Sequence, residues 1–123
     1  MKDFDYYFKV AEYYKRVGNE LKIKYGNDPI PKHIIEKEFI QISGYAQGSV
    51  LVTDYCYNLI NKARYSFQYP LFERIRRGLF YYLGEGYNYN GDIIWEPKGK
   101  KKIVVGCWRN GKCNLDNDPR ISA

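Results

Sequence analysis

The sequence predicts an α+β protein in which a winged-helix-like unit of three helices is followed by a β-hairpin wing and a second, C-terminal β-hairpin. Three observations support this fold class. Apolar residues recur at helical spacing in the first half, turn residues separate strand-like runs in the second half, and helices followed by a hairpin are the order of a winged helix. We expect one domain over residues 1–123, made of an N-terminal helix (1–26), the winged-helix-like core (31–84) and the C-terminal hairpin (87–115).

The first helix is predicted over residues 3–25, where Asp3 can cap the start. Its apolar stripe consists of Phe4, Tyr7, Phe8, Ala11, Tyr14, Val17 and Leu21. Gly18 weakens a helix, so we expect a bend or an end there. The wide stripe fits either packing on its own domain or a homodimer formed through this helix.

A second helix follows the turn Gly26-Asn27-Asp28-Pro29, and Pro31 is suited to its first position because the N–H that proline lacks is not needed there. Its inner face would carry Ile34, Ile35, Phe39 and Ile42, and Gly44 would end it. A third helix is predicted over residues 53–62, with Tyr55, Cys56, Leu59 and Ile60 on the inner side. Two helices joined by a short linker have the spacing of a helix-turn-helix, so the third would be the recognition helix.

The first hairpin pairs residues 70–75 with residues 79–83 through the turn Arg76-Arg77-Gly78. Arginines at such a tip can enter the minor groove or hold the DNA backbone, so Arg74, Arg76 and Arg77 are expected to contact DNA. The alternative is that these charges only discourage pairing of an edge strand with other chains.

The second hairpin pairs residues 92–96 with residues 102–108, and Asn110-Gly111 marks a further tight turn. Its loop is strongly cationic and suited to phosphate contact without sequence information, or else simply solvated. The residues concerned are Lys98, Lys100, Lys101 and Lys102.

On the predicted recognition helix, asparagine can pair with adenine, and tyrosine and the basic side chains can reach phosphates. The candidate reading surface is Tyr57, Asn58, Asn61, Lys62 and Arg64. Alternatively, the two asparagines only cap or solvate an exposed helix end. A stacking platform for single-stranded bases, made of Tyr81, Tyr82, Tyr87 and Tyr89, is a further alternative, although tyrosines at strand spacing are more often core.

The charge distribution points to a polyanionic partner. The net charge is +6, and residues 62–112 hold 11 Lys and Arg against 4 Asp and Glu, whereas residues 1–61 hold eight of each. Nucleic acid, DNA more than RNA, is the expected partner. An anionic membrane is disfavoured because the basic residues fall in hairpins and not on an amphipathic helix.

Several classes of protein are disfavoured by what the sequence lacks. Three cysteines (Cys56, Cys107 and Cys113) are an odd number, and with a single histidine, His33, they offer no zinc spacing. We expect no metal and no cofactor. No apolar run is long enough to span a bilayer and the acidic start is unlike a secretory signal, so a cytoplasmic protein is expected.

An enzyme is not expected, but the sequence offers one catalytic alternative, a metal-dependent nuclease. Asp92, Glu96 and Lys98 are the ingredients of a metal-dependent nuclease site. Their spacing is wrong, since the first acid of such a site normally lies on an earlier strand, and Pro97 interrupts the strand. A metal-dependent nuclease is therefore a remote alternative.

Parts of the sequence resemble a family of small bacterial and phage domains of unknown function, over roughly residues 32–112. The resemblance lies in Gly48-Ser49-Val50, Thr53-Asp54-Tyr55-Cys56-Tyr57-Asn58, Asn61-Lys62, Pro70-Leu71-Phe72, Tyr81-Tyr82-Leu83-Gly84 and Gly106-Cys107-Trp108-Arg109-Asn110-Gly111. Many members carry Pro where this chain has Val52. The resemblance implies a winged-helix-like fold and an association with conflict between phage and host, and it implies no reaction.

Two functions from different classes follow. The first is a non-catalytic nucleic-acid-binding protein, with duplex DNA as the expected ligand. The second is a phage-encoded inhibitor, an anti-CRISPR or other anti-defence protein, that binds a host defence protein or its nucleic acid. Tyrosine and arginine are good anchors for such a protein interface.

Overall fold

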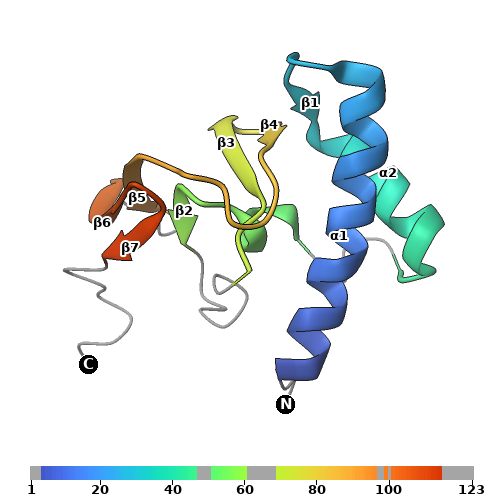
Figure 1. Cartoon of the computed structure of the whole chain (residues 1–123), viewed down its shortest axis with the longest axis horizontal. Coiled ribbons are helices and arrows are strands. Elements are labelled where there is room, and N and C mark those ends of the chain that lie inside the picture. The colour runs from blue at the N-terminus through green and yellow to red at the C-terminus, as the bar shows by residue number, and fades with distance from the viewer. Residues whose placement is uncertain (1–3, 47–50, 61–68, 97–98, 100, 115–123) are drawn as a thin grey trace.

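The computed structural model describes residues 4–46, 51–60, 69–96, 99 and 101–114. Over these residues the chain is α+β, as predicted, and every strand except the short β1 follows the two α-helices. The elements are α1 (Phe4–Tyr25), β1 (Ile30–Pro31), α2 (Lys32–Ser43), the 3-10 helix η1 (Val52–Tyr55), β2 (Leu59–Ile60), β3 (Phe72–Arg76), β4 (Leu79–Tyr82), β5 (Gly91–Trp95), β6 (Ile103–Arg109) and β7 (Lys112–Asn114). Figure 1 shows the two helices at one end, the sheet β1-β4-β3 beside them, and the sheet β2-β5-β6-β7 at the far end.

Helix α1 is unbroken at Gly18, so the expected end at this residue is wrong. The ring of Tyr82, on β4, lies directly against Gly18, and a Cβ at this position would overlap it. Glycine therefore stands here because the strand packs closely on the helix. Most of the predicted stripe is buried in the chain's own core, although Phe8 is about half exposed.

Helix α2 begins at Lys32, one residue later than predicted. Pro31 is extended and pairs with Leu79 in a short strand contact, and the Lys32 N–H donates to the Gly78 carbonyl. The predicted end is confirmed, since Gly44 adopts a left-handed conformation and its N–H donates to the Ile40 carbonyl.

Both predicted hairpins form. Strands β3 and β4 pair antiparallel around a turn at Arg77 and Gly78, and β5 pairs antiparallel with β6. Asn110 and Gly111, both with positive φ, join β6 to β7 in the predicted tight turn.

The predicted recognition helix is wrong over its described residues. Residues 52–55 form only the 3-10 helix η1, and the chain then runs extended into β2. The reason is burial on both sides: Tyr55, Cys56 and Tyr57 are consecutive and buried, whereas an amphipathic helix would leave one of its faces in water. In the part of the chain that the structure describes, neither a third α-helix nor a recognition helix is therefore present.

The segment of residues 55–60, which runs from the last residue of η1 through β2, is the seam between the two sheets. On one side Cys56 forms a parallel bridge with Phe72, and the Tyr57 N–H donates to the Phe72 carbonyl. On the other side β2 pairs parallel with β5, Leu59 opposite Ile94. The seam therefore runs parallel to β3 and to β5, and all three segments end on the same side.

Two apolar clusters lie on either side of this seam. The larger one joins α1, α2 and the sheet β1-β4-β3 around Tyr14, Phe39 and Phe72. The smaller one consists of Ile60, Ile93 and Val105, with Trp95 and Trp108 packed against it. Among the described helices, none has the length and apolar character needed to cross a bilayer.

Candidate nucleic-acid interface

A hollow of about 500 Å³ opens where the seam diverges from β3. It is lined by Asn58, Arg74, Ile75, Arg76, Arg77, Ile94, Glu96 and Lys102. Its lining comes from within and just after three segments: Asn58 lies in the seam, Arg74 to Arg76 lie in β3, and Glu96 follows β5. A concave site in which a few polar side chains converge is a common place for a ligand.

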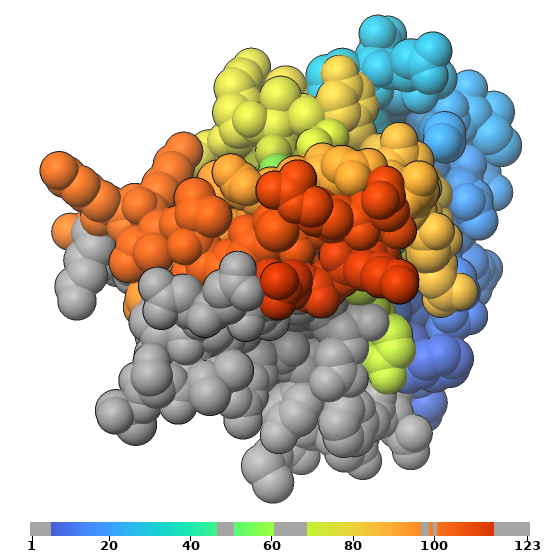
Figure 2. All heavy atoms as spheres, turned by 60° about the vertical axis from the view of Figure 1, so that its left-hand side comes forward, coloured from blue at the N-terminus to red at the C-terminus, as the bar shows by residue number. Residues whose placement is uncertain are grey.

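In the space-filling view of Figure 2, the C-terminal sheet, orange to red, crosses the front of the molecule below hairpin β3–β4, in yellow. The hollow takes its cationic side chains from both of these parts: Arg74, Arg76 and Arg77 come from the β3–β4 hairpin, and Lys102 comes from the approach to β6. Two of the predicted cationic segments are thus brought to one site.

Asn58 fixes the position of Arg74 and thereby the inner wall of the hollow. Its side chain donates from Nδ2 to the Arg74 carbonyl (2.8 Å) and accepts the Arg74 N–H at Oδ1 (2.9 Å). The side chain thus pairs with the edge of β3 as a neighbouring strand would. Asn58 lines the hollow, but its amide is already engaged with the backbone and is not displayed on a helix.

Glu96 follows β5 and is the centre of the charges in the hollow. Its carboxylate lies 2.8 Å from Arg77 Nη2, 3.5 Å from Arg74 Nη2 and 3.6 Å from Lys102 Nζ. The side chains of Glu96 and Arg74 are only 13% and 12% exposed, whereas those of Arg77 and Lys102 are 83% and 64% exposed. The pair Glu96 and Arg74 therefore lies at the bottom of the hollow, and the exposed side chains of Arg77 and Lys102 lie at its rim.

The charges in the hollow do not cancel. Arg74, Arg76, Arg77 and Lys102 face a single carboxylate, so the lining carries a surplus of positive charge. Partial desolvation raises the pKa of Glu96, but the neighbouring Arg74, Arg77 and Lys102 outweigh this and hold it below its ordinary value. Glu96 is therefore ionised at neutral pH, and the hollow remains net cationic.

The other predicted contact residues are placed differently. Lys101 is exposed beside Lys102. Tyr57 is buried and does not reach the hollow surface. The predictions for Asn61, Lys62, Arg64, Lys98 and Lys100 lie outside the described residues.

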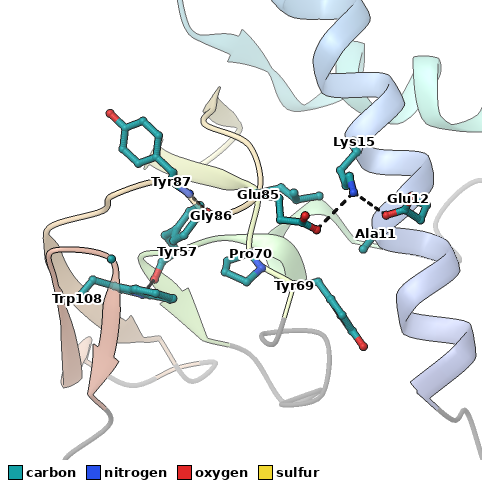
Figure 3. Close-up of a pocket in the computed structure, with 12 residues that line it drawn as sticks. Ala11, Glu12, Lys15, Tyr57, Tyr69, Pro70, Glu85, Gly86, Tyr87 and Trp108 are labelled. Carbon is teal, nitrogen blue, oxygen red and sulfur yellow. Dashed lines mark hydrogen bonds and ion pairs between the residues drawn. The ribbon is translucent and has the colours of Figure 1, made fainter.

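Tyr57 instead forms part of the wall of a second, smaller pocket of about 170 Å³ between α1 and the C-terminal sheet (Figure 3). Its hydroxyl donates to the Gly84 carbonyl (2.6 Å) and accepts the Tyr87 N–H (3.0 Å). Its own carbonyl accepts a hydrogen bond from Trp108 Nε1 (2.8 Å). These contacts tie the loop before β5 and strand β6 to the seam, so Tyr57 has a structural role.

Two of the four tyrosines of the predicted stacking platform, Tyr82 and Tyr89, are packed against protein. Tyr89 is buried, stacks on Tyr57 with ring centroids 5.2 Å apart, and donates from its hydroxyl to Glu73 (2.6 Å). Tyr82 packs on Gly18 and Phe72. Tyr87 is the most exposed of the four, and it borders the pocket of Figure 3.

The residues proposed for a nuclease are not arranged as a metal site in the described ranges. Asp92 is exposed and faces Cys107 across the β5–β6 pair, whereas Glu96 is bound to three cations. Nowhere in those ranges do three His, Cys, Asp or Glu side chains gather so that they could hold a metal ion.

Sequence reasoning missed the role of Glu96 as the partner of the wing arginines. The available signal is a lone acid two residues before the first lysine of the cationic loop, a position that fits a counter-ion as well as a metal ligand. It also missed Ile75 and Ile94, the apolar side chains of the hollow.

Comparison with known proteins identifies relatives but no activity. The uncharacterized protein YnaC of Bacillus subtilis (strain 168) is 36% identical over 103 residues, which are 83% of this chain. The matched region makes up only 38% of the length of YnaC. No solved structure matches. The profile of the family described as Domain of unknown function (DUF7225) matches residues 9–115, and the chain therefore belongs to this family.

Proposed function

We propose that this chain is a non-catalytic nucleic-acid-binding protein that contacts duplex DNA through the cationic hollow between its hairpins. The observation that carries the proposal is the gathering of Arg74, Arg76, Arg77 and Lys102 in one concave site with a single carboxylate. Separate hairpins supply these cations, so their meeting is a property of the fold and not of one basic run.

The rim of the hollow is suited to phosphate contact. Arg76, Arg77, Lys101 and Lys102 are exposed, and their long side chains can reach a DNA backbone. Such contacts release condensed counterions, so binding depends steeply on salt. Arginine can also bind a phosphate through two parallel N–H donors.

This proposal keeps the wing of the winged-helix prediction and leaves out its recognition helix. Hairpin β3–β4 acts as the wing and approaches the DNA backbone with Arg76 and Arg77 at its tip. Since residues 53–60 form no recognition helix, we expect binding that tolerates many sequences. The role in conflict between phage and host that the family resemblance implies stays a prediction.

A protein partner is the second candidate function. It is favoured by the pocket of Figure 3, whose lining includes the aromatic residues Tyr69, Tyr87 and Trp108. Tyrosine and tryptophan are frequent anchors of protein interfaces. A pull-down with wild type and Tyr87→Ala tests it, and retention of the same proteins by both would exclude this pocket as the anchor.

Fluorescence anisotropy with labelled duplex DNA, single-stranded DNA and RNA at two salt concentrations tests the first proposal. We expect submicromolar duplex binding that weakens steeply with salt. The variant R76A/R77A should bind at least about tenfold more weakly, since it loses two phosphate contacts.

The matched control is K22A/K24A, which removes two exposed cations from the last turn of α1, outside the hollow. It has the same net charge as R76A/R77A, and we expect it to bind nearly as well as wild type. An equal loss of DNA affinity in both variants would mean that binding depends only on net charge, and it would contradict an interface at the hollow. Absence of duplex binding at low salt would overturn the proposed function.

A further inference from the structure

We infer that the hollow is a seat for one phosphate monoester, such as the terminal phosphate of a nucleic-acid strand, and that Glu96 fills this seat in the free protein. The inference rests on the proposed function and narrows it to the kind of phosphate that the deepest part of the hollow accepts.

The first argument is the convergence of the cations. Arg74, Arg77 and Lys102 each place a nitrogen within 4 Å of the same carboxylate. Cations that follow a duplex backbone are spread out, because successive phosphates are separated along the strand. Three cations aimed at one point instead suit a compact anion, and the Glu96 carboxylate stands where its oxygens would be.

The second argument is depth. Arg74 is almost covered, and only about an eighth of its side chain is exposed. A phosphate within a duplex is flanked by its neighbours and cannot leave the backbone to enter a hollow of about 500 Å³. A terminal phosphate projects from the strand and can reach Arg74 once Glu96 turns outward.

Charge gives the third argument. A phosphate monoester carries about −1.5 to −2 charges at neutral pH, whereas a phosphodiester or a carboxylate carries −1. With Glu96 displaced, three cations converge on the seat and balance a dianion better than a monoanion. The planar guanidinium groups of Arg74 and Arg77 can each bind two of its oxygens.

The apolar side of the hollow completes the site. Ile75 is an exposed residue of β3. Ile94 is on β5 and pairs with Leu59 of β2. Beside the cationic cluster they offer a surface on which the sugar attached to the phosphate can pack. The hollow therefore offers cations for the phosphate and an apolar surface for the sugar of a terminal nucleotide.

The test compares one duplex in three forms: with 5′-phosphates, with 3′-phosphates, and with hydroxyl groups at all ends. Wild-type protein should prefer one phosphorylated form over the hydroxyl form by about tenfold, which corresponds to about 1.4 kcal/mol. Thymidine 5′-monophosphate is the competitor that separates two sources of the group. Strong competition indicates a seat for free nucleotides as well, and weak competition indicates that the strand end is needed.

The variant E96Q tests the displacement. Removal of the competing carboxylate should tighten binding of the preferred phosphorylated duplex by about tenfold. The control D92N loses one negative charge from an exposed side chain of β5, the strand that Glu96 follows, and this side chain does not line the hollow. It should change the affinity by less than twofold.

Equal binding of all three duplex forms by wild type and E96Q would overturn the inference and leave the proposed duplex binding intact. An equal gain in E96Q and D92N would overturn the displacement of Glu96. Failure of every oligonucleotide to bind either protein would overturn the proposed function and the inference together.

Discussion

The side-chain amide of Asn58 hydrogen-bonds both backbone groups of Arg74, as donor to its carbonyl and as acceptor from its N–H. The change Asn58→Ala leaves both partly buried groups without this partner. We expect the free energy of unfolding to fall by about 1–3 kcal/mol, measured by urea denaturation.

Asn58→Asp is the informative companion variant. It retains the acceptor for the Arg74 N–H but replaces the donor with a second oxygen that faces the Arg74 carbonyl. Its loss of stability should be at least as large as that of Asn58→Ala. Wild-type stability in both variants would contradict a structural role for this amide.

The contact between Gly18 and Tyr82 gives a second prediction. Gly18→Ala improves the intrinsic helix propensity of α1 by about 1 kcal/mol, but the added methyl overlaps the Tyr82 ring. We expect a net destabilisation of about 1–3 kcal/mol, because the strand must move away from the helix. Asn19→Ala, at the exposed neighbouring position, should not destabilise the protein, and thermal unfolding would compare the two. A gain in stability for Gly18→Ala would show that β4 does not pack on this position.

Alkaline pH should destabilise the protein. Burial first, and then the hydrogen bond to Glu73 and its charge, raise the pKa of Tyr89 above the ordinary value of 10.0. The folded state therefore holds this proton more tightly, so the contribution to stability is complete below pH 10 and is lost as the pH rises above it. Each such tyrosine costs up to about 1.4 kcal/mol per pH unit. Burial also raises the pKa values of Tyr14, Tyr55, Tyr57 and Tyr82.

Urea unfolding at a series of pH values above 8 measures this decline. Tyr89→Phe should show a shallower decline than wild type, because one titrating group is gone. The same slope in both proteins would mean that the Tyr89 proton is not held by the fold.

The cysteines should react in a fixed order. Cys113 is exposed on β7, Cys107 is half-buried, and Cys56 is fully buried, where burial raises the pKa of its thiol. Partial burial and Cys107 also raise the pKa of Cys113, but its thiol is the exposed one. An alkylating reagent should therefore label Cys113 first and Cys56 only after unfolding. Peptide mass spectrometry gives the order, and Cys113→Ser should remove the fastest phase. Rapid labelling of Cys56 in the folded protein would contradict the packing of the seam.

The parts of the fold that the sequence predicts correctly depend on local signals. Gly44 ends α2 because only a left-handed residue fits there, and Asn110-Gly111 turns β6 into β7 for the same reason. Strand alternation and a glycine turn were enough for the β3–β4 hairpin. Each of these signals acts over a few residues.

The seam was missed because its partners are distant. Residues 55–60 are bounded by no strong turn signal, and their pairing with Phe72 and Ile94 is set by the tertiary structure. An apolar run of this length is ambiguous between a helix and a buried strand. Three consecutive buried side chains, Tyr55 to Tyr57, argue against an amphipathic helix, which would leave one of its faces in water.

The sequence predicts which cationic residues belong to the candidate site, but it does not predict how they are arranged. Arg74, Arg76, Arg77 and Lys102 were identified from composition and from their place in the hairpins. That Arg74 and Lys102 would meet at Glu96 depends on the parallel arrangement of β3, the seam and β5. This arrangement follows from the seam, which the sequence alone did not indicate.

The seam also determines how the molecule should come apart. Its backbone is hydrogen-bonded to Phe72 of one sheet and to Ile94 of the other. Separation of the two sheets would therefore break backbone hydrogen bonds along the seam and expose their N–H and C=O groups to water. Among the described residues, the apolar cluster of the C-terminal sheet has three buried members, Ile60, Ile93 and Val105, and is too small to persist alone. Heating should therefore melt both sheets in one cooperative transition, and the slowest hydrogen exchange in the C-terminal sheet should report the opening of the whole chain.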